Sequence, residues 1–306
     1  MPSLRRGMLA LAETKRIERF ITQNGVSKGF ALRFVAGETL DEAIAVTSEL
    51  NAAGLSATLD LLGENVTSEE DARAATEAYC EILDRIAASG VNSNISIKLT
   101  MLGLDISDEL ARCNTATVVE RARAHGNFVR IDMESSAYTQ RTLDIAYDLH
   151  AAYPGTVGIV LQSYLYRTDR DVRDAIERGI RVRLVKGAYA ESDMVAYPSK
   201  KEVDAAYRRQ MEALLEGGNY PAFATHDEKM IAAAKEYARR HGIGPERFEF
   251  QMLYGIRRDL QLRLVREGYN VRVYVPYGTQ WYPYLTRRLA ERPANLLFVI
   301  RNLLKG

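Results

Sequence analysis

Short runs rich in β-branched and aromatic residues alternate with longer segments of helical periodicity from Ala31 onward, and no Gly/Ser-rich linker interrupts them. This alternation is typical of βα units that build a parallel sheet. The helix-like segments include residues 68–89 and 229–242. The nine strand-like runs are ALRFVAG, SATLDLLGE, NISIKLT, FVRIDME, VGIVLQSY, RVRLVKGAY, PAFATHD, FEFQMLYG and VRVYVPYG.

Nine candidate strands are one more than a (β/α)8 barrel needs. Eight runs carry polar or charged residues in or just beyond the apolar stretch, whereas RFVAG presents none toward its end, so we take RFVAG as an element before the barrel. A doubly wound open sheet would also fit, but no G-x-G-x-x-G turn occurs. A (β/α)8 barrel fits better, because its active site collects residues from the C-terminal ends of many strands.

The length of 306 residues suits a single barrel domain, which we expect to span residues 1–306. Residues 1–30 are predicted to form one or two helices packed outside the barrel. The 41 basic and 40 acidic residues form no like-charge block, which argues against nucleic acid as a partner. Any binding of anions must therefore be local.

The sequence predicts neither a membrane span nor a signal peptide. No apolar run approaches the roughly 20 residues of a membrane span, and the first residues carry charges where a signal peptide needs apolar ones. Cys80 and Cys113 have no second Cys or His at ligand spacing, which argues against a metal site and for buried free thiols in a reducing compartment. We expect a cytoplasmic protein, and loose contact with the inner face of a membrane is compatible with this.

Two charged residues lie near the ends of consecutive predicted strands. In SIKLT, Lys98 shares one strand face with Ser96 and Thr100, and the apolar residues occupy the other face. Near the rim of a barrel lumen this lysine would contact a substrate; the alternative is a solvated edge lysine. Asp132 in VRIDME occupies a comparable position one βα unit later. A carboxylate near Lys98 would keep both the lysine and the carboxylate ionised. The two residues would then form part of a substrate site, or alternatively a structural ion pair.

The runs RVRLVKGAY and FATHD contribute further candidates. Arg183 and Lys186 flank an apolar centre, and Gly187 allows a ligand to approach the backbone closely. Lys186 alone would suggest a Schiff-base lysine of the aldolase kind. Thr225 and His226 offer hydrogen-bonding groups at another strand end. A lone histidine is more often structural than functional, so only the convergence of these residues is informative.

After the last strand-like run, the loop TQWYP leads into a predicted helix with Tyr284, Arg287, Arg288 and Glu291. Tyr284 lies three and four residues before the two arginines, so its ring neighbours both of them. Adjacent helical positions are about 100° apart, so both guanidinium groups can reach one small anion only if this helix lies across the barrel mouth. The alternative is an ordinary solvated helix face.

The motifs SIKLT, RIDMES, VLQSYLYR, RLVKGAY, FATHD, FEFQMLYG, VRVYVPYG and YLTRRLAE, in this order, resemble those of the proline dehydrogenase family. These are FAD-dependent enzymes that oxidise L-proline, and the chain length suits the monofunctional form. The resemblance covers about Leu59 to Phe298. It implies hydride transfer from proline to flavin N5, formation of Δ1-pyrroline-5-carboxylate, and passage of the electrons to a quinone.

The resemblance also assigns roles residue by residue. It implies that Lys98, Arg287 and Arg288 grip the substrate carboxylate, and that Glu291 supports the arginine helix. Asp132 matches the acidic residue near Lys98, and Arg183 matches an arginine near flavin N5. The resemblance thus implies that both are catalytic and that Arg183 also contacts the cofactor. The implied walls of the ring pocket are Leu253, Tyr274 and Tyr284. The implied FAD contacts are Met133, Gln162, Lys186, Gly187, Ala188, Thr225 and His226.

Two other readings stay open. The first is a flavin-free barrel of the aldolase class that uses Lys186 or Lys98 as a Schiff base. The second is a non-catalytic barrel that binds a carboxylated ligand or a partner protein; against it stands the desolvation cost of so many polar groups at one rim. The polar segment after Tyr189 is also a candidate lid, through Glu191, Ser192 and Tyr197.

Overall fold

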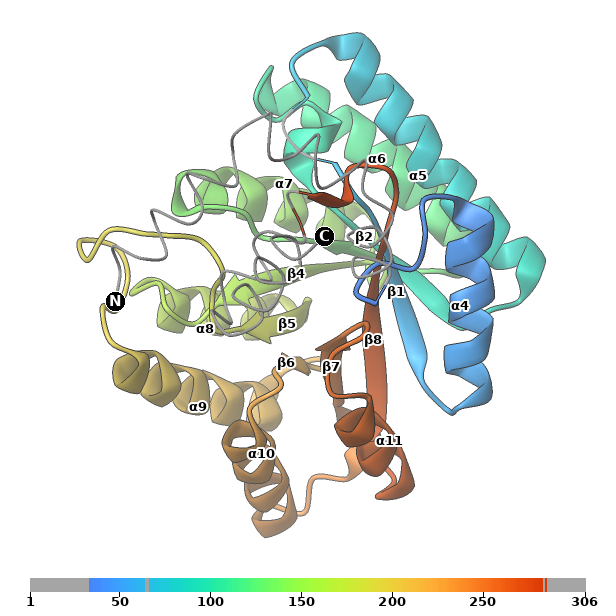
Figure 1. Ribbon diagram of the computed structural model, residues 1–306. Helices are drawn as coiled ribbons and strands as arrows, with labels where there is room; N and C mark the ends of the chain where they lie inside the picture. The colour runs from blue at the N-terminus through green and yellow to red at the C-terminus, as the bar shows by residue number, and fades with distance from the viewer. Residues whose placement is uncertain (1–32, 64–65, 283, 285–306) are drawn as a thin grey trace, which may run out of the picture.

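Eight parallel strands form a closed barrel in chain order, and β8 pairs back to β1 (Figure 1). The computed structural model describes residues 33–63, 66–282 and 284. This confirms the predicted (β/α)8 barrel and rules out the open sheet. The strands are β1 (Ser56–Leu61), β2 (Ser93–Ile97), β3 (Val129–Ile131), β4 (Val157–Gln162), β5 (Arg181–Val185), β6 (Ala222–Ala224), β7 (Glu249–Leu253) and β8 (Asn270–Tyr277).

Helices surround the barrel on its outside (Figure 1). The first of those described, α4, precedes β1 and packs against β1 and β8, and the others follow the strands in turn. The α-helices are α4 (Leu40–Ala52), α5 (Glu69–Ser89), α6 (Asp108–Ala124), α7 (Thr139–Ala152), α8 (Thr168–Arg178), α9 (Lys200–Gly217), α10 (Glu228–Arg240) and α11 (Arg258–Arg266). Three short 3-10 segments are η1 (Leu99–Leu102), η2 (Ser136–Tyr138) and η3 (Pro245–Arg247).

The two ends of α5 show how local sequence determines where a helix begins and ends. The Ser68 side chain accepts a hydrogen bond from the backbone N–H of Asp71, which satisfies a donor that the first turn leaves unpaired. At the other end Gly90 adopts a left-handed conformation with φ of 68°. The helix therefore fills the predicted segment 68–89 almost residue for residue.

The run RFVAG is not a barrel strand. Residues 33–39 form turns and bends, and the backbone N–H of Ala36 donates to the carbonyl of Pro276 in β8 at 2.9 Å. This confirms that the run lies before the barrel proper. The predicted helices within residues 1–30, and the predicted helix that carries Arg287, Arg288 and Glu291, lie outside the described residues.

The apolar core lies between the strands and the surrounding helices, where Leu59, Ile95 and Ile97 are fully buried. The lumen differs from that of most barrels, which branched aliphatic side chains fill. Here the alternate strand positions include Asp60, Ser96 and the other polar residues described below. Successive side chains of a strand point to opposite faces, so each strand turns one face toward the helices and the other toward the lumen.

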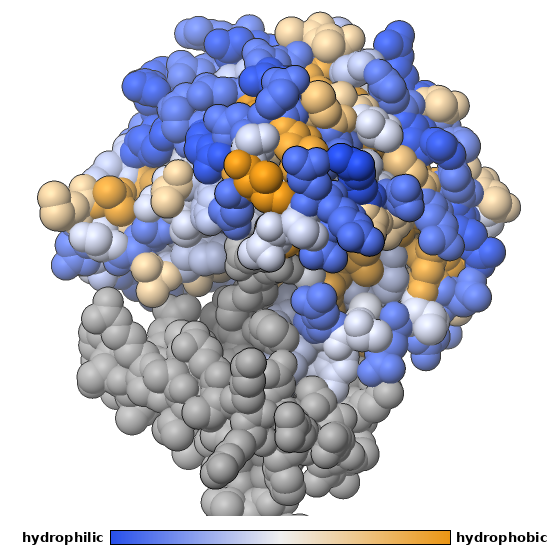
Figure 2. Space-filling model, turned by 90° about the horizontal axis from the view of Figure 1, so that it is seen from above, coloured by the Kyte–Doolittle hydropathy of each residue, from blue (hydrophilic) through white to orange (hydrophobic). Residues whose placement is uncertain are grey.

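Most of the described surface seen in Figure 2 is hydrophilic, with small groups of hydrophobic residues between. The large hydrophobic side chains exposed within the described residues are Ile106, Tyr166, Met194 and Val195. The expectation of two buried thiols is wrong for Cys113, which is exposed, whereas Cys80 is half-buried. Cys113 lies on the outward face of α6, because the neighbouring Asn114 takes the buried position.

Candidate active site

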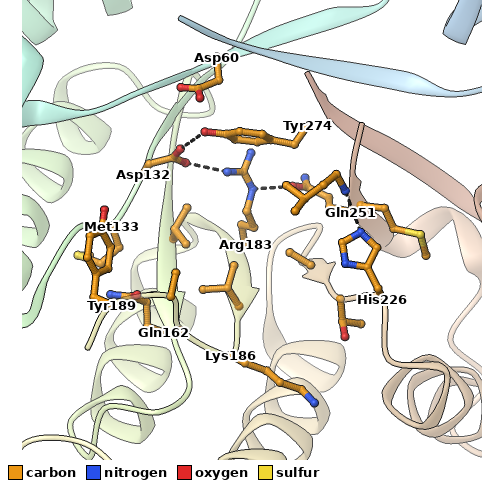
Figure 3. Close-up of a pocket in the computed structure, with 18 of the residues that line it drawn as sticks. Asp60, Asp132, Met133, Gln162, Arg183, Lys186, Tyr189, His226, Gln251 and Tyr274 are labelled. Carbon is orange, nitrogen blue, oxygen red and sulfur yellow. Dashed lines mark hydrogen bonds and ion pairs between the residues drawn. The ribbon is translucent and has the colours of Figure 1, made fainter. Parts of the chain in front are cut away.

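A cavity of about 440 Å³ opens at the C-terminal ends of the strands (Figure 3). Every predicted site residue within the described part of the chain lines it. These residues are Lys98, Asp132, Met133, Gln162, Arg183, Lys186, Gly187, Ala188, Thr225, His226, Leu253, Tyr274 and Tyr284. The structure thus brings together residues from seven strand ends and from the chain beyond β8.

Lys98 forms a buried ion pair with Asp60, whose carboxylate lies 2.9 Å from the lysine Nζ. Burial alone would lower the pKa of Lys98, but Asp60, Tyr79 and Asp132 together raise it above the ordinary lysine value. Burial raises the pKa of Asp60, and the Lys98 ammonium opposes that shift. The contact distance is that of an ion pair, so we take Lys98 as a fixed positive charge at neutral pH.

The sequence reasoning missed Asp60 and considered Asp132 as the carboxylate beside Lys98. The structure shows that Asp132 acts on Lys98 only as a more distant charge, and that its own partners are other groups. A signal for Asp60 was present. In the strand SATLDL, Thr58 and Asp60 alternate with apolar residues in the same way that Ser96 and Lys98 do in and directly after β2.

Asp132 lies at the centre of a hydrogen-bonded cluster (Figure 3). The Arg183 Nη1 donates to one of its carboxylate oxygens at 2.7 Å, and the Tyr274 hydroxyl donates to the other at 2.8 Å. Burial, followed by the Asp132 charge, raises the pKa of Tyr274 well above its ordinary value, so this phenol stays protonated. Arg183 also lies over the Tyr274 ring, 5.2 Å from its centroid.

Gln251 extends this cluster down the lumen. Arg183 Nε donates to the Gln251 amide oxygen at 2.5 Å, and the amide nitrogen donates to Glu249. Arg183 also donates through Nη2 to the Ser96 hydroxyl at 3.1 Å. With 4% of its surface exposed, Arg183 is held in one orientation by three polar partners. A cation fixed in this way needs little reorganisation when charge changes nearby.

Lys186 lies between two carboxylates at the other side of the cavity. Its Nζ donates to Asp204 on α9 at 2.5 Å and to Asp227 at 2.8 Å. Burial opposes ionisation of both aspartates, yet their hydrogen bonds with Lys186 bring the pKa of each below the ordinary value. A lysine bonded to two ionised carboxylates is not placed to act as a free amine nucleophile.

His226 and Thr225 follow β6 and are both held by backbone contacts. The backbone N–H of Leu253 donates to His226 Nε2 at 3.0 Å (Figure 3), so a neutral imidazole carries its proton on Nδ1. The backbone N–H of Asp227 donates to the Thr225 hydroxyl oxygen at 3.0 Å. Asp227 in turn caps α10 by accepting from the N–H of Lys229. This short run therefore positions three functional side chains at once.

The mouth of the cavity is bordered by segments outside the strands. Tyr284 is buried and lines the cavity. Glu191, in the predicted lid, accepts hydrogen bonds from the backbone and hydroxyl of Ser136. The backbone N–H of Tyr197 donates to the Tyr164 carbonyl at 2.7 Å. These contacts attach the segment after Tyr189 to the loops that follow β3 and β4, and its role as a lid stays a prediction.

Neither a metal cluster nor a membrane span occurs within the described residues. No group of three His, Cys, Asp or Glu side chains there could hold a metal ion. No helix in that part of the chain is long and apolar enough to cross a bilayer.

A family model described as proline dehydrogenase matches residues 43–301. Proline dehydrogenase 2 of Bacillus subtilis is 45% identical over 285 residues, which cover 93% of this chain and 94% of that protein. Proline dehydrogenase of Deinococcus radiodurans is 40% identical over 306 residues, covering 99% of this chain and 98% of that protein.

The barrel is also similar to solved structures of a longer protein. Proline utilization A (PutA) from Bdellovibrio bacteriovorus, inactivated by N-propargylglycine, has a TM-score of 0.81 and 31% identity over 86% of this chain. The matched region makes up 32% of that chain, so this chain spans about a third of its length. PutA from Corynebacterium freiburgense, at 22% identity and a TM-score of 0.76, shows the shared fold alone.

Proposed function

Because this chain belongs to the proline dehydrogenase family, we propose that it uses FAD to oxidise L-proline to Δ1-pyrroline-5-carboxylate. The observation that carries this proposal is the composition of the cavity. One wall holds a fixed ammonium at Lys98 and the cluster of Asp132, Arg183 and Tyr274, and the opposite wall holds the Lys186 loop. The first wall suits a small carboxylated substrate, and the second suits an anionic cofactor.

The residues of the cavity fit FAD. Lys186 has three N–H donors, and its two aspartates accept from two of them, so a third is left to reach a phosphate. Gln162 donates its amide N–H to the Glu134 carbonyl at 2.8 Å, which fixes the orientation of its side chain. The remaining proposed FAD contacts are Met133, Gly187, Ala188, Thr225 and His226. The cavity volume lies in the range of about 300 to 1,000 Å³ that is typical of ligand sites.

We propose that Lys98 binds the substrate carboxylate together with Arg287 and Arg288, which lie outside the described residues with Glu291. A charge-assisted pair fixes orientation as well as affinity, and it selects a small amino acid without any excess of basic residues in the whole chain. Leu253, Tyr274 and Tyr284 form the apolar and aromatic surface against which a pyrrolidine ring would pack.

When bound, FAD would supply the redox chemistry by accepting a hydride from C5 of the proline ring at its N5 atom. The chain's own contribution is to orient the substrate and to stabilise the charge that moves. The Arg183 guanidinium is a buried cation that lines the cavity, and Asp132 and Gln251 hold it in place. We further propose a quinone as the final electron acceptor; a cytoplasmic location with contact to the inner membrane face stays a prediction.

The structure weakens the Schiff-base alternative. The pKa of Lys98 is raised through its neighbouring carboxylates, and Lys186 contacts two ionised aspartates. Lys98 is therefore held in the protonated form, which cannot attack a carbonyl, and the hydrogen bonds of Lys186 to Asp204 and Asp227 tie its amine to carboxylates. The non-catalytic alternative leaves unexplained why a buried arginine with three hydrogen-bond partners lies beneath the cavity.

Visible spectroscopy under anaerobic conditions tests the proposed function. The purified protein should show flavin bands that bleach on addition of L-proline, because the substrate reduces the cofactor, and that return when a water-soluble quinone is added. A decarboxylated proline analogue serves as the control and should leave the bands unchanged. A protein that cannot be reconstituted with FAD, or whose bands persist with proline, would overturn the proposal.

The loop after β5 offers a test of the proposed cofactor site. Gly187 has φ of 123°, and a Cβ added there would lie 2.4 Å from the Tyr164 ring. A strained backbone or displaced ring costs about 1–3 kcal/mol, so Gly187→Ala should weaken FAD binding at least about tenfold. The measurement is flavin release on dilution of the purified protein. Gly179→Ala is the control, because φ is also positive at that glycine but nothing lies within 4 Å of the added Cβ. Equal FAD affinity in both variants would contradict the assignment of this loop.

A further inference from the structure

The barrel has a second cavity at its opposite end. It has a volume of about 350 Å³ and is lined by residues at the beginnings of the strands, among them Asn94, Arg130, Arg181, Glu249 and Arg272. The N-terminal end of a barrel usually serves stability and not binding. The charges of this cavity do not fit a purely structural role, because its cations outnumber its carboxylates.

Three arginines face one carboxylate. Among the described residues that line the cavity, Arg130, Arg181 and Arg272 are the cations and Glu249 is the one acid, which leaves a formal charge of +2. Glu249 is already engaged: Arg272 Nε donates to its two oxygens at 3.0 and 3.2 Å, and Gln251 donates as well. It forms no ion pair with either of the other two arginines.

Arg130 is buried and forms no salt bridge within the described residues, and Glu249 and Asp132 act on it only as more distant charges. It is 3% exposed, its Nη1 donates to the carbonyls of Ile159 and Arg181 at 3.0 and 2.7 Å, and its Nε has no partner. Burial, and then the neighbouring Arg183, lower the pKa of this guanidinium well below its ordinary value. A buried cation of this kind is costly unless an anion compensates it.

Arg181 lies partly exposed at the rim of the cavity. Its Nε is buried and has no hydrogen-bond partner in the described structure. The guanidinium groups of Arg130 and Arg181 lie 4.8 and 5.3 Å from the centroid of the same ring, that of Phe128. Two like charges on one ring are unfavourable unless a negative charge lies between or beside them.

The backbone around the cavity is shaped to bring these groups together. Gly158 makes room for Arg130, because a Cβ at that position would lie 2.6 Å from the arginine Nη1. Tyr220 adopts φ of 46° although a proline follows it, and its ring lies 5.5 Å from the Arg181 guanidinium. Non-glycine residues held at positive φ often mark binding sites. The arrangement is therefore built by several elements and not by chance exposure of surface arginines.

We propose that this cavity binds a small dianionic oxyanion of the phosphate or sulfate type. A dianion would neutralise the formal charge of +2, and its oxygens would accept from guanidinium N–H groups of Arg130 and Arg181, which line the cavity. The site is separate from the candidate active site, since Gln251 and Glu249 stand between the two cavities. The proposal does not depend on the reaction catalysed at the other end.

Calorimetric titration of inorganic phosphate into the FAD-loaded protein tests this proposal. The candidate active site is first saturated with a cyclic carboxylate that cannot be oxidised, and chloride holds the ionic strength constant. We expect one saturable site per chain, and weaker binding of acetate, which carries a single charge. Arg181→Gln should lower the phosphate affinity at least about tenfold, because one charge-assisted hydrogen bond is lost.

Two further variants make the test decisive. Arg239→Gln removes the same charge from the exposed end of α10 and should leave phosphate affinity unchanged. Glu249→Gln should raise the affinity several-fold, because it removes the carboxylate that competes with the anion, and a folding defect would not produce that sign. Absence of saturable binding in the parent protein, or equal phosphate affinity in the parent and Arg181→Gln, would overturn the proposal.

Discussion

Replacing Arg183 with methionine should slow flavin reduction by saturating L-proline at least about 100-fold, while FAD remains bound. The guanidinium is the cation that three polar partners hold fixed beneath the cavity. Loss of one such preorganised group typically lowers a rate about 10²- to 10³-fold. Methionine retains the volume of the side chain and removes the charge, so the effect should appear in the rate constant more than in the concentration of proline for half-saturation.

Anaerobic stopped-flow spectroscopy of the flavin bands measures this rate directly. Arg183→Lys should give an intermediate rate, because it keeps the charge but cannot contact Asp132, Gln251 and Ser96 at once. Arg170→Met, on the exposed face of α8, is the matched control and should reduce its flavin at the parental rate. If Arg183→Met also retained the parental rate, Arg183 would be a structural residue of the lumen and not part of the catalytic site.

The barrel could be predicted from the sequence because the hydrophobic pattern of each strand and each helix is contained within its own segment of the chain. Strands such as VGIVLQ and helices such as residues 69–89 are signalled by their own stretch of chain, the strand by a short continuous apolar run and the helix by its periodicity and its capping side chain. The polar strand ends were equally visible. Since all parallel strands of a barrel end at one rim, their convergence in one cavity followed from the fold class alone.

The pairing of charges within the lumen could not be predicted in the same way. Asp60 is aligned with Ser96 in the register between β1 and β2, so its carboxylate reaches Lys98 two residues further on. Register depends on the closure of the whole barrel and leaves no local sequence signal. The same holds for Asp204, which contacts Lys186 from α9, the helix that follows β5 in the chain.

The excess of cations at the N-terminal rim of the barrel could not be predicted from the sequence either. Arg130, Arg181 and Arg272 lie on three strands that are distant in the sequence, and each alone resembles an ordinary charged residue at a strand start. A net charge of +1 for the whole chain hides a local concentration of positive charge. The local electrostatics at this rim therefore required the three-dimensional arrangement, whereas at the candidate active site the fold class predicted the convergence and the family resemblance supplied the residue roles.

The ion pair between Lys98 and Asp60 allows the structural and substrate-binding roles of this lysine to be separated. Lys98→Met leaves the Asp60 carboxylate buried without its partner, and breaking a buried pair in this way costs about 3–5 kcal/mol of folding free energy. If Lys98 also binds the proline carboxylate, the same variant should raise the KM for L-proline about 10- to 100-fold. A single substitution mixes these two effects.

The double variant Lys98→Met/Asp60→Asn separates them. Because it removes both charges, most of the lost thermal stability should return, while the KM for L-proline should stay as high as in Lys98→Met. Asp60→Asn alone keeps the ammonium and should not raise the KM, since the substrate carboxylate then faces less competition for Lys98. Thermal unfolding and steady-state kinetics on the three variants measure both quantities. Recovery of the parental KM in the double variant would show that Lys98 only balances the charge of Asp60, and the carboxylate of proline would then have to be bound by other cations at the mouth of the barrel.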